Sequence, residues 1–153
     1  GEQLAQAWGE TPPERVVLLG VAVDREIIGI ESRAVNRCQS QRADATGFVP
    51  EDNRVLSSAH PLDCELHSSV DTAALVQRLN RAGFPAECSS DAGRYLCNGV
   101  YFHALKLAAK AARPTDCVFV HLPQVGNAKS ADSEDRWSLA DLLGATEAVL
   151  AGL

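Results

Sequence analysis

Segments with strand character alternate along this chain with segments of helical periodicity. The strand-like segments are rich in valine, isoleucine and other apolar residues, and they span residues 15–23, 27–35, 86–89 and 117–121. The helical segments span residues 3–8, 70–82 and 96–112, with a final helix after Ser138. Alternation of this kind is typical of a parallel sheet whose connecting helices cover both faces. We therefore expect an α/β fold, a three-layer α/β/α sandwich with a largely parallel mixed sheet.

Local signals set the limits of several of these elements. The near-continuous apolar run at 15–23 predicts a strand that is buried on both faces. Gly83 follows the second helical segment and is a typical C-terminal cap. Ser138, with Asp141 three residues later, predicts a capping box at the start of the last helix. The polar stretch at 36–53 has little periodicity and predicts a long loop.

Composition limits the number of domains and the classes of partner. A chain of 153 residues with 46% hydrophobic content suits one globular domain, residues 1–153. Its formal charge of -6 repels phosphate backbones and anionic lipid headgroups, so we expect neither a nucleic-acid nor a membrane partner. No apolar run reaches the roughly 20 residues that cross a bilayer, and no basic-then-apolar signal pattern opens the sequence. The sequence therefore predicts a soluble, cytoplasmic protein.

Cysteine usage agrees with a reducing compartment. The five cysteines are Cys38, Cys64, Cys88, Cys97 and Cys117. They are odd in number and contain no CxxC pair, so they indicate neither a disulfide framework nor a zinc ribbon. We expect all five thiols to be reduced.

Two clusters of ligand-type side chains have simple structural explanations. The first has HxxxCxxH spacing and comprises His60, Cys64 and His67. On a helix this spacing can gather three metal ligands, but a proline directly after the first histidine favours a loop. The second is an acidic group in a predicted loop and comprises Asp132, Glu134 and Asp135. A solvated surface explains it, so we expect no metal ion and no cofactor.

Cys97 has the strongest case for a chemical role. A short strand and a turn at Ala92 and Gly93 precede it, and the next helix begins at about residue 96. In the first turn of a helix, unpaired N–H groups and the positive end of the helix dipole favour the thiolate, which is the attacking species. Nearby N–H groups can also bind a developing oxyanion. The alternative is that Cys97 is a small buried core residue, as most cysteines are.

His121 and Glu31 are the candidate partners of Cys97. His121 follows four strand-type residues and is predicted at the end of its strand, where a histidine can also be structural. Open α/β sheets place their sites beyond the carboxyl ends of the strands, and we expect both Cys97 and His121 there. Glu31 is an acid in an apolar segment, where an ionised carboxylate needs a partner such as an imidazolium. Otherwise it lies on the solvent face of a half-buried strand.

Three motifs occur in a defined order along the chain. A strand-like run reaches Gly20 and is followed by a glutamate segment at residues 30–36. Residues 92–98 read Ala-Gly-x-aromatic-aliphatic-Cys-Asn, and residues 121–123 read His-aliphatic-Pro. In this order and at these separations the motifs resemble those of the type I pyroglutamyl peptidases, also called pyrrolidone-carboxylate peptidases. The resemblance covers about residues 16–150.

This resemblance implies a reaction and a role for each candidate residue. Proteins of this family are cytosolic cysteine exopeptidases, so Cys97 would attack the amide carbonyl that follows an N-terminal pyroglutamyl residue. His121 would act as base and then as acid for the leaving amine, and Glu31 would orient and stabilise the imidazolium. Water would then hydrolyse the thioester intermediate. The family commonly forms homo-oligomers, which makes self-association an expectation here.

The resemblance also implies substrate contacts, and two features depart from the family pattern. The substrate contacts are expected at Val21, Ala92 and Gly93, where Val21 stands in place of the family's glutamine. The family's N-terminal strand and its Gly-Phe-x-Pro-Phe-Gly pocket loop are not present in this sequence, which begins at Gly1. One alternative is therefore a non-catalytic or altered-specificity relative that uses the scaffold for binding or assembly. A thiol redox sensor based on Cys97 is a third hypothesis.

Overall fold

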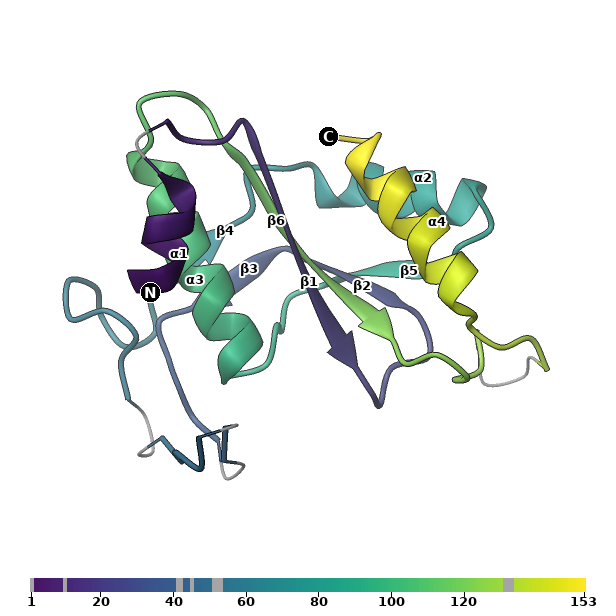
Figure 1. Cartoon of the computed structure of the whole chain (residues 1–153), viewed down its shortest axis with the longest axis horizontal. Coiled ribbons are helices and arrows are strands. Elements are labelled where there is room, and N and C mark those ends of the chain that lie inside the picture. The colour runs from purple at the N-terminus through teal and green to yellow at the C-terminus, as the bar shows by residue number, and fades with distance from the viewer. Residues whose placement is uncertain (1, 10, 41–42, 45, 51–53, 131–133) are drawn as a thin grey trace.

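A mixed four-stranded sheet lies at the centre of the fold (Figure 1). The computed structural model describes residues 2–9, 11–40, 43–44, 46–50, 54–130 and 134–153. The strand order is β1-β6-β2-β5, and the strands are β1 (Arg15–Ala22), β6 (Asp116–Pro123), β2 (Ile28–Glu31) and β5 (Ala86–Ser89). β1 runs parallel to β6 and β2 runs parallel to β5, whereas β2 and β6 are antiparallel. The predicted largely parallel mixed sheet is confirmed.

Helices cover both faces of this sheet. The helices are α1 (Glu2–Trp8), α2 (Thr72–Arg81), α3 (Leu96–Lys110) and α4 (Leu139–Leu150). Val118 and Val120 of β6 pack into a core with α2 and α4, while Cys117 and Phe119 pack into a second core with α1 and α3. Successive strand residues point to opposite faces, so an apolar strand needs cover on both sides. The predicted three-layer α/β/α arrangement follows from these two cores and is visible in Figure 1.

β1 differs from the prediction that it is buried on both faces. In the described part of the chain it pairs with β6 alone, so it forms an edge of the sheet. Leu19 and Val21 are 49% and 62% exposed, and the exposed apolar surface continues onto Leu139 and Leu143 of α4. β6, which has a neighbour on each side, is the strand that is buried on both faces. Apolar content alone did not distinguish the edge strand from the central one.

The segment at 27–35 forms two strands instead of one. The chain leaves the central sheet at Ser32, and β3 (Arg33–Val35) pairs with β4 (Glu65–His67) in a separate two-stranded sheet. The Ser32 N–H donates to the Ser89 carbonyl at 2.7 Å, and the Ser32 carbonyl accepts from the Ser68 N–H at 2.9 Å. The crossing between the sheets therefore leaves no backbone group of Ser32 unpaired, which satisfies the requirement of buried backbone.

The predicted helix caps and the predicted loop agree with the structure. α4 begins with a complete capping box between Ser138 and Asp141. α2 ends beside Gly83, which has a positive φ of 84°. The described residues between 36 and 50 contain no helix or strand. The fully buried Asn36 anchors this loop, because its side chain bonds to the backbone of Ser57 in both directions at 2.8 and 2.9 Å.

No helix among the described residues combines the length and the apolar character that crossing a membrane requires.

Candidate active site

Cys97, His121 and Glu31 meet on the face of the sheet that α3 covers. Cys97 is the second residue of α3, and His121 shares its face of β6 with Phe119, whose ring centroid is 4.7 Å from that of His121. Glu31 ends β2, the neighbour of β6. A cleft of about 510 Å³ opens beside Cys97 and His121, lined by the turn after β1 and by the segment that leads into α3. The three candidates from the sequence are therefore brought together.

The general rule for α/β sheets predicts a site at a common carboxyl edge of the strands. The site of this protein departs from that rule. His121 lies inside β6, which continues to Pro123, and not at its end. β5 runs antiparallel to β6, because β5 is parallel to β2 and β2 is antiparallel to β6. The carboxyl end of β5 therefore points away from that of β6, and the segment 90–95 returns the chain to the place where α3 begins.

The Glu31 carboxylate orients the imidazole of His121. Glu31 is fully buried, and its Oε1 lies 2.7 Å from His121 Nδ1. The alternative position for Glu31, on a solvent face, is therefore wrong. With Nδ1 donating to the carboxylate, Nε2 is the ring nitrogen left to exchange a proton with the Cys97 thiol.

Burial and charge act in opposite directions on this pair. Burial raises the pKa of Glu31, but the hydrogen bonds of His121 and the Ser89 hydroxyl, with the charges of Arg25 and His121, hold that pKa below its ordinary value. Burial lowers the pKa of His121, but hydrogen bonds with Cys97 and Glu31 and their charges raise it to about 9. At neutral pH the site therefore holds an ionised Glu31 and a protonated His121. An imidazolium beside a thiol is the arrangement that stabilises a thiolate.

The start of α3 supplies the other half of the chemistry. The N-terminal cap residue, Tyr95, makes no side-chain capping bond in the described part of the chain, so its side chain does not occupy the free N–H groups of the first turn. These groups and the helix dipole favour negative charge at Cys97 and on an oxyanion. Cys97 is half-buried, so a substrate can reach its sulfur from the cleft. The alternative of a fully buried core cysteine does not apply to Cys97, although it describes Cys117.

Gly20 makes room for the Cys97 side chain. A Cβ atom at this position would lie 2.8 Å from Phe119 Cζ and 3.3 Å from Cys97 Sγ. A larger residue at position 20 would displace the Phe119 ring, which packs beside His121. Gly20 belongs to one of the sequence motifs, and its close approach to Phe119 and Cys97 is the reason for a glycine here.

The expected substrate-contact residues all line the cleft. Val21 is 62% exposed, Ala92 is buried, and Gly93 has a positive φ of 77°. The Gly93 N–H donates to the Asp91 carboxylate at 3.0 Å, so it is already engaged. The free N–H groups at the start of α3 are therefore better candidates for an oxyanion site than the N–H of Gly93.

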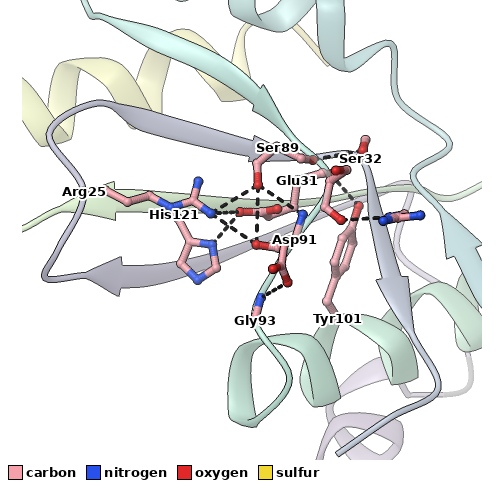
Figure 2. A network of polar contacts seen from close by, with 10 residues as sticks. Arg25, Glu31, Ser32, Ser89, Asp91, Gly93, Tyr101 and His121 are labelled. Carbon is pink, nitrogen blue, oxygen red and sulfur yellow. Dashed lines mark hydrogen bonds and ion pairs between the residues drawn. The ribbon is translucent and has the colours of Figure 1, made fainter. Parts of the chain in front are cut away.

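Arg25 is a site residue that the sequence analysis did not single out. It lies in the turn between β1 and β2, and its Nη2 is 3.0 Å from Glu31 Oε1 (Figure 2). The available signal was the buried acid itself, because a carboxylate in an apolar strand needs cationic partners and Arg25 is six residues upstream. Figure 2 shows Arg25 and His121 converging on the same carboxylate.

The two other clusters do not form a comparable site. Cys64 Sγ lies 3.8 Å from His60 Nδ1, whereas His67 lies beside Glu65 on β4. In the described ranges, no group of three or more histidine, cysteine or acidic side chains is arranged to hold a metal ion. Of the acidic cluster, Asp132 lies outside the described residues.

Several known proteins are similar to this chain in sequence. A family model described as pyroglutamyl peptidase matches residues 1–149. The pyrrolidone-carboxylate peptidase of Thermococcus onnurineus is 33% identical over 122 residues, which are 80% of this chain and 60% of that protein. The protein of the same name from Halalkalibacterium halodurans is 35% identical over 124 residues, with the same two coverages of 80% and 60%. This chain thus spans about three fifths of the length of these relatives.

Solved structures show the same fold. The pyrrolidone carboxyl peptidase of Thermococcus litoralis superposes with a TM-score of 0.85 at 25% identity, covering 98% of this chain and 70% of that one. The enzyme from Fervidobacterium islandicum gives a TM-score of 0.85 at 26% identity, covering 97% of this chain and 73% of the other. Since the family model matches nearly the whole sequence and the fold agrees, the chain belongs to the pyroglutamyl peptidase family.

Proposed function

We propose that the chain carries the catalytic centre of a cysteine peptidase that removes N-terminal pyroglutamate from peptides. The observation that carries this proposal is the buried contact of 2.7 Å between Glu31 and His121, beside a cleft that exposes Cys97. A nucleophile, a base and a group that orients the base are the components that covalent hydrolysis requires. The names of the relatives supply the substrate class.

The geometry supports a two-step reaction. The Cys97 thiolate attacks the carbonyl carbon of the pyroglutamyl residue, and the N–H groups at the start of α3 stabilise the oxyanion. His121 donates its proton to the leaving amine as the C–N bond breaks, which leaves a thioester on Cys97. His121 then accepts a proton from the water that hydrolyses the thioester, and free pyroglutamate leaves. Glu31 remains ionised and holds the ring throughout.

The substrate contacts belong to the same proposal. Val21, Ala92 and Gly93 line the cleft, and we assign them to contacts with the pyroglutamyl residue or the segment after it. Pyroglutamate has no charged amino group, so its ring does not need to pair with the carboxylates of Asp24 and Asp91 that line the cleft. No metal ion or cofactor is needed, because the thiolate supplies the nucleophile. Val21 and the pocket loop motivate the non-catalytic alternative, whereas the names of the relatives favour a peptidase.

The expected setting of the protein is also proposed. The formal charge of -6 argues against nucleic acid as a partner. Five free thiols are typical of a protein in the reducing cytoplasm. The exposed apolar surface of β1 and α4 makes self-association into a homo-oligomer plausible in physical terms, because large exposed apolar patches mark contact surfaces.

A panel of fluorogenic amides tests the substrate class. We expect the protein to release the fluorophore from a pyroglutamyl amide at least about 100 times faster than from the prolyl or alanyl amide, judged by kcat/KM. The prolyl compound is a matched control, since its ring lacks the lactam carbonyl and carries a charged amine. Equal rates on all three compounds, or no release from the pyroglutamyl amide, would contradict the proposal.

A further inference from the structure

One oxygen of the buried Glu31 carboxylate is shared by two cationic side chains. Oε1 lies 2.7 Å from His121 Nδ1 and 3.0 Å from Arg25 Nη2. Glu31 is fully buried, and its second oxygen, Oε2, has no hydrogen-bond partner among the described residues. The two cationic groups that hold this buried carboxylate therefore meet at a single oxygen.

Arg25 contacts three groups around the Glu31 carboxylate through its Nη2 atom. Besides Glu31, its Nη2 donates to Ser89 Oγ at 3.1 Å and to the Asp91 carbonyl at 3.2 Å. Ser89 ends β5, and Asp91 lies in the segment that leads to the nucleophile. Figure 2 shows the guanidinium beside the His121 ring, at the same end of the Glu31 carboxylate. Arg25 thus connects the turn after β1, the end of β5 and the carboxylate.

A glycine in β2 provides the space for this guanidinium. A Cβ atom at Gly29 would lie 1.8 Å from Arg25 Nη1 and 2.9 Å from Arg25 Cζ. Such contacts are far inside van der Waals distance, so an alanine there would displace the guanidinium. Gly29 pairs with His121 in the sheet, and a Cβ atom there would lie at an ordinary contact distance of 3.4 Å from Glu31 Oε1, so the close contacts are those with Arg25.

We propose that Arg25 is a positioning residue for the reaction, which fixes the Glu31 carboxylate and shares its Oε1 with His121, and that Gly29 is the specific support of Arg25. This inference rests on the proposed cysteine peptidase function. Arg25 acts through Glu31 and is not assigned a contact with substrate.

Sharing one oxygen has a consequence for the charge on His121. The charged groups near its ring are Glu31 of β2, Arg25 of the β1–β2 turn and Cys97 of α3. Around the cleft mouth stand Asp24, Asp91 and Arg94. Arg25 and the imidazolium are like charges drawn to the same oxygen, so Arg25 disfavours the protonated ring. Without Arg25, the imidazolium of His121 is the only cation at Oε1. The pKa of His121 then rises, and the ring stays protonated to higher pH.

Imidazole nitrogen NMR of the histidines measures this directly, with no substrate present. The chain has four histidines, so the His121 signal can be assigned from its loss in His121→Ala. We expect Arg25→Gln to move the His121 titration midpoint upward by about one pH unit. Arg25→Lys, which keeps the charge, should retain a midpoint close to that of the wild type. Arg33→Gln is the matched control, because Arg33 donates to the Ser90 carbonyl at 2.8 Å without touching Glu31.

A double-mutant cycle tests the role of Gly29. Gly29→Ala should raise the midpoint in the wild-type background and lower kcat for the pyroglutamyl amide about tenfold, as Arg25→Gln does. Added to Arg25→Gln, it should change neither value further, because the shorter side chain leaves room for the new methyl group.

Two results would overturn the inference. One is a His121 midpoint in Arg25→Gln that equals or falls below the wild-type value. The other is a full additional effect of Gly29→Ala in the Arg25→Gln background. Because the NMR readout needs no turnover, it judges Arg25 even if the pyroglutamyl amide is not cleaved, and the two proposals therefore fail separately.

Discussion

Replacing Cys97 with alanine lowers cleavage of a pyroglutamyl amide by at least about 1,000-fold, because no other side chain in the cleft can form the thioester. Cys97 is half-buried and begins a helix, so the loss of its sulfur leaves the fold intact. We expect the free energy of unfolding to change by less than about 1.5 kcal/mol. Steady-state kinetics and urea unfolding check the two quantities separately.

Cys88→Ala is the matched control for this substitution. Cys88 is also a free cysteine, but it is exposed on β5 and lies outside the cleft lining. Its replacement should leave kcat/KM within about twofold of the wild type. If Cys97→Ala retained more than a tenth of the activity, the nucleophile would have to be another group.

Glu31→Gln is expected to have the second largest effect. The amide is nearly the same size as the carboxylate but carries no charge, so the imidazolium of His121 loses the partner that lies 2.7 Å away. The pKa of His121 then falls from about 9 toward its ordinary value. The loss in kcat should be on the order of 100-fold or more, as for other residues that orient a catalytic histidine.

The pH profile separates this effect from a general loss of structure. The imidazolium must be present to protonate the leaving amine, so wild-type activity is lost as the pH rises through about 9. In Glu31→Gln the same loss begins at lower pH. Glu65→Gln is the control. It removes the β4 acid that pairs with Arg33 of β3, and it should not shift the pH profile of activity. An unchanged alkaline limb in Glu31→Gln would show that Glu31 does not set the state of His121.

The proposed catalytic residues stand out in the sequence because they occupy locally unusual positions. Cys97 follows a turn and opens a helix, and Glu31 is a charge within an apolar strand. Local sequence order records such features. The sequence gives no comparable signal for Arg25, because an arginine in a turn is common. Its role depends on the fold, which places Arg25 3.0 Å from Glu31. The reason for a glycine at residue 20 depends in the same way on where Phe119 and Cys97 pack.

The arrangement of the strands was harder to predict than their existence. Residues 15–23 and 117–121 have similar apolar content, yet β1 is an edge strand and β6 is central. Strand order and direction are set by long-range pairing, which composition does not encode. The antiparallel pairing of β2 with β6 is also why the expected common carboxyl edge does not exist.

We expect His121 and the start of α3 to activate Cys97. The most direct measurement is the rate at which iodoacetamide alkylates Cys97 at pH 6, compared within the same molecule with the more exposed Cys88 by peptide mass spectrometry. We predict that Cys97 reacts at least about ten times faster than Cys88, and that His121→Ala removes this advantage. If Cys97 reacts no faster than Cys88 in the wild type, then His121 and the start of α3 do not activate it.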